Sequence, residues 1–409
     1  MIYKCFLNDK FKRTFFFVVE PPKMKRSSTE KYKGLLHLRV YMKFLFSFLS
    51  FCNLLDIKYK QNYFHMKILV TGNYEPLYNR TQILISGLKK NDNVNLVELP
   101  IDKNFTKQKF INEAIDADFI YLPPFTHSDV RFIKKLSSKP LIFDPLISKY
   151  LTKVFDYKQI SRFSPRAIKN YFKDKFALDA ADILLADTQA HKEYFCKKFV
   201  IKSEKIHVLP IGADCNVFYP TKNKISSSKF KVGFYGGFIP LQGTKLIIEA
   251  AGYLNSHKDI EFELIGNGFE FNEVFKIAEK NKLQNISFPG WIDYDKLNQK
   301  INSFDLCLGI FGATQKADLV IPNKIYHYAA AGKCIISKDT KAIKEIFTDS
   351  ENIILIQNKP QILAEKILEI KNKPEFINKL SANARTLMID NFDNTHISNR
   401  FLNILMKHS

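Results

Sequence analysis

Cysteine is scarce in this chain, and no apolar run is long enough to cross a membrane. The six cysteines among 409 residues form no C-x-x-C pair and no zinc-like spacing, which argues against a disulfide scaffold or zinc domain and for reduced thiols. The apolar run at residues 40–55 carries Lys43 and is shorter than the ~20 residues that span a bilayer. It also lacks a signal-peptide cleavage site. We therefore expect a cytoplasmic protein, with the inner face of the cytoplasmic membrane as its one candidate membrane location.

Acidic residues are fewer than basic residues in this chain. The chain holds 41 Asp and Glu against 62 Lys and Arg, for a net charge of +21, and its hydrophobic content of 46% excludes disorder. Such a chain can meet nucleic acid, anionic lipid or phosphorylated substrates. No recognised nucleic-acid motif is present, so we expect no nucleic-acid partner.

The first 65 residues lack the alternating strand and helix pattern that starts at Met66. They hold 13 basic and four acidic residues, which gives this extension +9 of the total charge. Two interpretations remain open: a membrane-surface or marginal transmembrane anchor, or translated upstream sequence ahead of a start at Met66. We favour the second.

From Met66 onward, short apolar runs alternate with helical stretches. The runs lie at 67–71, 94–99, 119–122, 141–144, 183–186, 206–209, 230–235, 261–265, 285–288, 306–310, 334–337 and 352–356. Continuous Ile, Leu and Val runs separated by helices predict parallel sheets covered on both faces. We expect two Rossmann-like domains at 66–219 and 230–390, joined by the polar linker 220–229, with ligands in the cleft between them. A last helix at about 395–407, within a C-terminal segment 391–409, is expected to cross back to the first domain.

Two segments of the second half favour a phosphate ligand. At 320–337, Pro322 suits the first turn of a short Ala-rich helix that Gly332 closes, and Asn323 and Lys324 follow it, with Lys324 adding a positive charge at the helix start. Amides in a first helical turn bind anions. At 230–254, a strand runs into a loop, 236–243, that contains Gly236, Gly237 and Gly243 and precedes a helix. Glycine lets the backbone approach a ligand closely.

These motifs resemble the retaining glycosyltransferases of family 4, which have the GT-B fold. Gly236–Gly243 (Gly-Gly-Phe-Ile-Pro-Leu-Gln-Gly) and Val320–Lys324 (Val-Ile-Pro-Asn-Lys) resemble one bacterial branch especially. The segments 144–148, 156–158, 180–191, 208–220, 264–268 and 288–292 are similar to further family motifs in the same order. The resemblance implies an α/β protein with two Rossmann-like domains whose parallel sheets face each other across a cleft.

The resemblance also implies an activity: transfer of a sugar from a nucleotide sugar to a glycan or lipid-linked acceptor, in the manner of a hexosyltransferase, with the anomeric configuration retained. The protein's main task is then to stabilise the negative charge of the leaving diphosphate. We expect Lys324, the amides near Pro322 and Asn323, and the 236–243 loop to do this. Gly266, Gly268 and Trp291 lie in the loops that the family places around the nucleobase.

Three polar residues are further candidates. His127 follows a predicted strand and matches the family's histidine near the reacting sugar, with an ordinary loop histidine as the alternative. Asp144 ends a predicted strand, where it could orient the acceptor hydroxyl or cap a helix. His327 and Leu319 stand where the family has two glutamates that bind the ribose and the donor sugar, respectively. His327 could still form a hydrogen bond to the ribose, although it is not a carboxylate. The side chain of Leu319 cannot bond a sugar hydroxyl. His191 is expected to be structural.

No metal and no other cofactor is expected. Asp116–Asp118 and Asp293–Asp295 both read Asp-x-Asp, a metal-binding pattern in other glycosyltransferases. The first precedes its strand and so lies at the wrong end for a cleft, and the second enters a helix, where capping explains it.

The segment 162–176 interleaves five basic residues with Phe, Ile and Tyr. It predicts either a peripheral contact with an anionic membrane or a solvated helix with one buried face. Three other functions stay open beside sugar transfer: a GT-B epimerase, a degenerate GT-B module that binds nucleotide or glycan without turnover, and a nucleic-acid binder suggested by charge alone.

Overall fold

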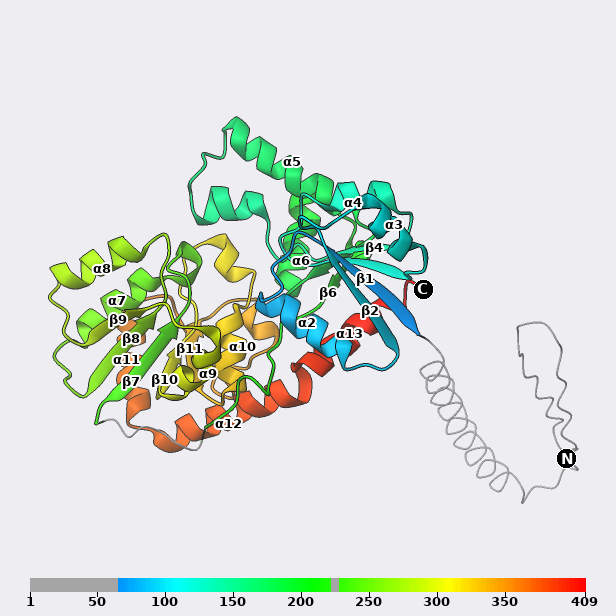
Figure 1. Cartoon of the computed structure of the whole chain (residues 1–409). Helices are drawn as coiled ribbons and strands as arrows, with labels where there is room; N and C mark the ends of the chain where they lie inside the picture. The colour runs from blue at the N-terminus through cyan, green and yellow to red at the C-terminus, as the bar shows by residue number, and fades with distance from the viewer. Residues whose placement is uncertain (1–64, 222–227) are drawn as a thin grey trace, which may run out of the picture. The chain divides into compact units, whose positions relative to one another are not determined.

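The computed structural model describes residues 65–221 and 228–409, in which two six-stranded sheets form (Figure 1). The first sheet comprises β1 (Met66–Gly72), β2 (Val94–Pro100), β3 (Phe119–Leu122), β4 (Leu141–Phe143), β5 (Ile183–Ala186) and β6 (Ile206–Val208). The second comprises β7 (Phe230–Tyr235), β8 (Ile260–Ile265), β9 (Ile286–Gly290), β10 (Leu306–Leu308), β11 (Cys334–Lys338) and β12 (Ile354–Ile356). The predicted extension, residues 1–65, lies outside the described residues except for its last one.

Every strand pair within these sheets is parallel. The inner strands β3 and β5 are buried along their whole length, whereas the edge strands β2 and β9 are buried only in part. Apolar runs without alternation suit strands that are covered on both faces. All twelve predicted strands are confirmed, with ends shifted by at most two residues.

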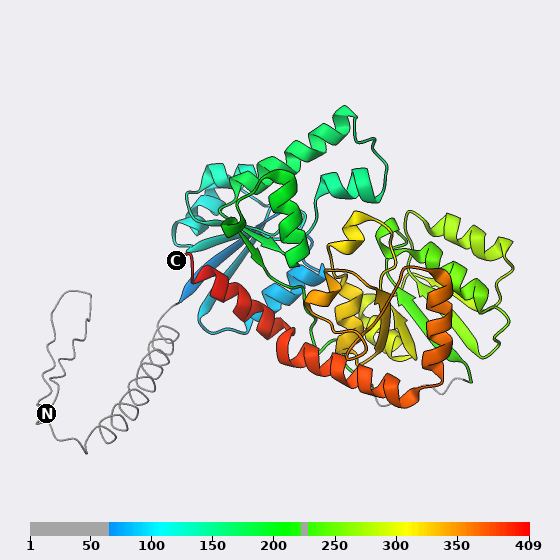
Figure 2. The same cartoon turned by 180° about the vertical axis from the view of Figure 1, so that it is seen from behind.

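Helices cover both faces of each sheet (Figures 1 and 2). Those of the first half are α2 (Asn79–Lys89), α3 (Lys107–Ile115), α4 (Val130–Leu136), α5 (Pro165–Ala180) and α6 (Gln189–Phe199). Those of the second half are α7 (Thr244–Tyr253), α8 (Phe271–Lys280), α9 (Tyr294–Asn302), α10 (Asn323–Ala330), α11 (Pro360–Lys371), α12 (Pro374–Asn391) and α13 (Asn394–Leu405). In the described residues, no helix is both long and apolar enough to cross a membrane.

In each sheet, the direction in which successive strands are added reverses once. The first sheet runs β2-β1-β3-β4-β5-β6 and the second runs β12-β11-β10-β7-β8-β9. The chain therefore changes direction across the sheet between β1 and β3, and again between β7 and β10. Loops at the carboxyl ends of such strands open a crevice, which is where α/β sheets bind ligands.

The last helix, α13, packs against α2 of the first half, as the red and blue segments of Figure 2 show. The contact needs a glycine, because a Cβ added to Gly87 would lie 2.1 Å from the Asn394 carbonyl oxygen. The Asn394 amide also donates to Ser86 and to Asp214, each at 3.1 Å. These contacts tie the C-terminal helix to the first half of the chain.

Candidate functional site

The loop after β7 is built on glycines that approach other backbone closely. Gly236 and Gly266 both have positive φ, and a Cβ on Gly266 would lie 2.1 Å from the Gly236 carbonyl oxygen. Gly243 also has positive φ, and a Cβ there would lie 2.2 Å from the Phe311 backbone, which follows β10. An L side chain fits neither Gly266 nor Gly243 without backbone movement, and the positive φ of Gly236 is strained for any L residue. The predicted glycine loops therefore meet at the β7–β10 reversal.

Lys324 lies directly beside this loop, in the first turn of α10. Its side chain is buried, and its Nζ lies 3.4 Å from the centroid of the Phe234 ring. A Cβ on Gly236 would approach that Nζ to 2.9 Å, so the glycine leaves room for the ammonium group. Burial lowers the pKa of Lys324 well below its usual range.

Two polar atoms at the start of α10 lack partners. Within the described part of the chain, neither Lys324 Nζ nor Asn323 Oδ1 has a hydrogen-bond partner, although both are buried. Pro322 occupies the position before the helix with an extended backbone rather than its first turn, which corrects the sequence prediction by one residue. A buried ammonium at a helix N-terminus is unfavourable alone and favourable with an anion in place.

His327 lies one turn further along α10, and protein groups bind both of its ring nitrogens. Its ring stacks on Phe218 at 3.8 Å between centroids. Nε2 lies 2.8 Å from Asn79 Oδ1 and Nδ1 lies 2.6 Å from the Tyr235 hydroxyl. Because Asn79 Oδ1 can only accept, Nε2–H donates and Nδ1 accepts from Tyr235. A ribose contact by His327 stays a prediction that would require one of these bonds to break.

Leu319 contributes its backbone here. Its carbonyl accepts a hydrogen bond from Thr188 Oγ1 at 2.5 Å. Next to it, the Glu345 carboxylate accepts from the amides of Gln189 and Ala190 at the start of α6. A carboxylate on a helix N-terminus is a favourable charge–dipole contact. The sequence analysis missed this link, because Glu345 and α6 are more than 150 residues apart.

Asp144 forms a buried ion pair rather than an open acceptor site. Its Oδ2 accepts from Arg80 Nε at 2.5 Å and from the Tyr121 hydroxyl at 3.3 Å, and Arg80 also donates to the Leu209 carbonyl at 2.6 Å. Burial raises the pKa of Asp144, and the Arg80 guanidinium opposes that shift. The pair links the residue that follows β4 to α2. The sequence analysis did not identify Arg80, which lies 64 residues from its partner.

His127 lies in the loop after β3, at the reversal of the first sheet. Its Nε2 contacts the Ile147 carbonyl oxygen at 3.0 Å, and its ring meets Phe143 edge-on at 5.0 Å. Asp174 Oδ1 lies 3.8 Å away, and burial raises the pKa of that carboxyl to about 6. Asp174 sits within the basic segment of the sequence and was not predicted as a site residue. The donor-sugar contact of His127 stays a prediction.

The remaining residues singled out in the sequence are Gly237, Gly268, Trp291 and His191. Gly237 and Gly268 belong to the glycine loops, and a Cβ on Gly268 would approach the Phe238 backbone to 2.7 Å. Trp291 is 76% exposed after β9, so its ring is open to solvent. His191 is buried and bonds Asp187 at 2.7 Å, in keeping with a structural role.

The two Asp-x-Asp segments make local contacts. Asp118 accepts from the Lys67 amide at 2.8 Å, ahead of β3. Asp293 holds the position before α9, yet its side chain forms no capping bond and instead pairs with Lys296 at 3.3 Å. The predicted capping role is therefore wrong for Asp293. Among the residues that the structure describes, no three His, Cys, Asp or Glu side chains cluster closely enough to hold a metal ion.

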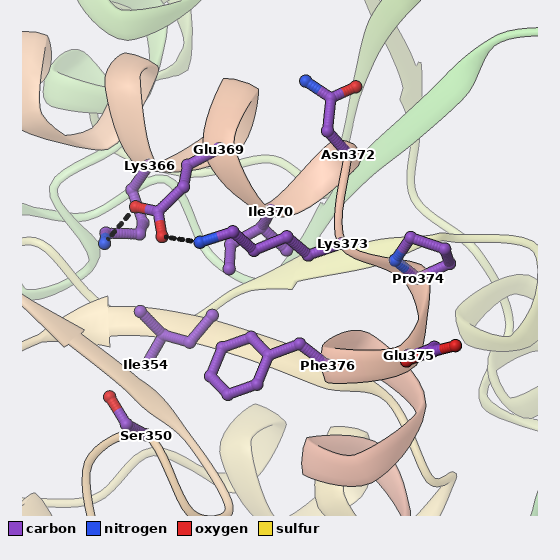
Figure 3. Close-up of a pocket in the computed structure, with 10 residues that line it drawn as sticks. All are labelled: Ser350, Ile354, Lys366, Glu369, Ile370, Asn372, Lys373, Pro374, Glu375 and Phe376. Atoms are coloured by element: carbon purple, nitrogen blue, oxygen red, sulfur yellow. Dashed lines mark hydrogen bonds and ion pairs between the residues drawn. The ribbon is translucent and has the colours of Figure 1, made fainter.

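A cavity of about 590 Å³ lies apart from these loops, between β12, α11 and α12 (Figure 3). Glu369 at its rim binds Lys366 at 2.5 Å and Lys373 at 2.7 Å, and these bonds lower its pKa to about 2. The single carboxylate thus offsets one of the two positive charges at the surface. The cavity brings together no buried, unpartnered polar group of the described chain.

The buried histidines predict how stability responds to acid. Burial lowers the pKa of both His127 and His327 to about 3, against 6.5 for an exposed histidine. The unfolded chain therefore binds protons first, so stability is full above about pH 6.5 and falls as pH falls toward about 3. At about pH 5 each histidine should lower the free energy of unfolding by about 2 kcal/mol.

Urea unfolding at neutral pH and at about pH 5 measures this loss. The double variant His127→Gln and His327→Gln should lose less stability between the two pH values than the wild type. An equal loss in both proteins would contradict the burial of the two imidazoles.

Solved structures with this architecture define the class of fold. HepE of Anabaena, solved in complex with UDP-glucose, superposes with a TM-score of 0.66 at 17% identity over 84% of this chain and 100% of HepE. Sucrose-phosphate synthase of Thermosynechococcus elongatus gives 0.66 at 13% identity over 84% and 98%. A glycosyltransferase of Rickettsia africae gives 0.59 at 15% over 84% and 98%. The chain has the GT-B fold, as predicted.

Comparisons of the sequence find one matching family model and one relative. Residues 218–387 of this chain match the model of the family Glycosyl transferases group 1, so this part of the chain is similar to that family. An uncharacterized glycosyltransferase of Methanocaldococcus jannaschii is 25% identical over 230 residues, which are 51% of this chain and 61% of that protein. The match thus spans less than two thirds of the relative.

Proposed function

We propose that this protein is a retaining glycosyltransferase that moves a sugar from a nucleotide sugar to a glycan or lipid-linked acceptor without a metal ion. The observation that carries the proposal is the start of α10. There Lys324 is buried, has no hydrogen-bond partner among the described residues and is adjacent to Gly236. A diphosphate seated on the first-turn amides would give this ammonium a counter-charge. HepE, which has the same fold, was solved with UDP-glucose, and this supports a nucleotide-sugar donor.

The residues of this site suit departure of a diphosphate. When the bond between the anomeric carbon and the phosphate oxygen breaks, its electron pair stays on the phosphate. Lys324 and the amides at the start of α10 would stabilise that charge. The acceptor hydroxyl forms the new bond to the anomeric carbon, and its proton passes to the departing phosphate oxygen. Asp144 is committed to Arg80, so we assign it no proton transfer.

A second candidate is a GT-B module that binds a nucleotide sugar without turning it over. His327 and Leu319 favour it, because neither offers a carboxylate to the ligand, and both ring nitrogens of His327 already have partners. Turnover separates the two functions, since both predict binding.

The test combines binding and product analysis on the full chain. UDP-, GDP-, ADP- and CMP-sugars are screened by thermal shift with and without EDTA, and sugar release from the stabilising donor is followed by proton NMR. We expect one nucleotide class to stabilise the protein equally in EDTA, and the first product to keep the anomeric configuration. Binding without release would favour the non-catalytic module, and loss of the shift in EDTA would overturn metal independence. No shift with any nucleotide would overturn the proposed donor site.

A further inference from the structure

The outer face of α5 carries an apolar row that the described protein does not cover. Ile168, Phe172 and Phe176 recur every four residues and are 54%, 45% and 45% exposed, and Phe163 just before the helix is 78% exposed. Residues four apart lie on one face of a helix. The opposite face supplies the core with its own apolar side chains: Ala167, Ala177 and Leu178. The helix is therefore apolar on two sides, although one suffices to hold it on the fold.

Positive charge borders this row on both sides. Between residues 158 and 175 the chain has six Lys and Arg and a single acidic residue, Asp174. Asp174 is buried beneath the helix, where it accepts from Ser148 and from the Tyr150 amide. The other nearby carboxylate, Asp179, is bound by Lys175 at 2.6 Å. The exposed charge around the row is thus almost entirely positive.

A small cavity opens at one end of the row. Its volume is about 260 Å³, and it is lined by His127, Ser128, Arg131, Lys173, Phe176 and Ala177. Two of these residues are cations and none is acidic. The Arg131 guanidinium lies over the Phe176 ring at 5.1 Å, so a cation and an apolar side chain share the rim. Such a pocket suits a phosphate group attached to an apolar body.

These features together fit an anionic bilayer. Apolar side chains flanked by Lys and Arg insert at the boundary between acyl chains and headgroups, while the cations bind anionic lipid. Single-stranded nucleic acid fits less well, because it needs open ring faces. Here Phe172 and Phe176 stack on each other at 5.5 Å, and Arg162 covers Phe163 at 4.5 Å. We propose that the outer face of α5, from Phe163 to Phe176, docks this protein on the surface of anionic phospholipid membranes. The docking is independent of the proposed sugar transfer.

Vesicle co-sedimentation of the full chain tests the proposal. We expect binding to vesicles that contain phosphatidylglycerol and weak binding to vesicles of phosphatidylcholine alone. The variant Phe163→Ser/Ile168→Ser should bind about tenfold more weakly, because two inserted side chains are lost. The variant Arg162→Gln/Arg166→Gln/Lys169→Gln should bind about a hundredfold more weakly and lose most of its salt dependence.

Matched controls lie on other exposed helices. Ile115→Ser on α3 and Lys276→Gln/Lys280→Gln on α8 should bind as the wild type does. Circular dichroism melts show that each variant is folded. Unchanged binding by both α5 variants would assign membrane binding to another part of the chain, such as the apolar run 40–55, and overturn the proposal. Equal binding to both vesicle types, or binding to single-stranded RNA without vesicle binding, would overturn it as well.

Discussion

Replacing Lys324 by methionine is expected to make the protein more stable and almost inactive. Methionine keeps most of the apolar stem but removes an ammonium that is buried without a hydrogen-bond partner in the described chain. Relief of that desolvation should raise the free energy of unfolding by about 1–3 kcal/mol. Loss of a cation at the leaving diphosphate should lower kcat/KM for donor turnover by about 100- to 1000-fold. Urea unfolding and a donor-turnover assay measure the two effects.

The opposite signs of these two effects make the prediction specific. A lysine that only packs against Phe234 would change stability and leave turnover near the wild-type value. Lys333 provides a matched control, because it lies at the other end of the α10 segment and outside the glycine loops. Lys333→Met should leave kcat/KM within about twofold of the wild type. Reduced stability together with full activity in Lys324→Met would contradict the assignment.

Removing either partner of the Arg80–Asp144 pair is expected to destabilise the protein strongly. Both side chains are almost fully buried, and Asp144→Ala would leave the guanidinium without its carboxylate. Breaking a buried pair in this way costs about 3–5 kcal/mol. Replacing both partners, as in Arg80→Met/Asp144→Leu, should cost clearly less than either single change, because no buried charge is left behind. Urea unfolding of the three variants measures these costs.

An ion pair at the surface serves as the comparison for the buried Arg80–Asp144 pair. Lys175 and Asp179 form an ion pair on α5, and Lys175→Ala should cost less than about 1 kcal/mol. A stable, inactive Asp144→Ala variant would show instead that Asp144 acts on a substrate, as the sequence analysis expected.

The strands and the glycine loops could be predicted from the sequence because their signals are local. An apolar run such as 183–186 predicts a buried strand by itself. Gly236 stands in one short motif, and Pro322 and Lys324 stand in another. The sheet reversal between β7 and β10 then brings those motifs to one crevice.

The polar contacts that cross the fold could not be predicted in the same way. In the sequence, Arg80 is typical of a surface residue on a helix. Only the fold places it beside Asp144, which follows β4. Asp174 stands in a basic segment, yet the register of α5 turns it inward to Ser148. His327 looked available to a ligand, and only the structure brings Asn79 and Tyr235 against its ring. Each pairing depends on side-chain direction and on residues far away along the chain.

The central claim is that the start of α10 holds the diphosphate of a nucleotide sugar on Lys324. Isothermal titration calorimetry with the nucleotide sugar that gives the largest thermal shift, repeated over a range of pH, tests it most directly. A bound diphosphate favours the charged lysine, so wild-type affinity should fall as pH rises past the depressed pKa of Lys324 in the free protein. Lys324→Met should bind at least about tenfold more weakly and without that pH dependence. Equal affinity and an equal pH profile in the two proteins would contradict the claim.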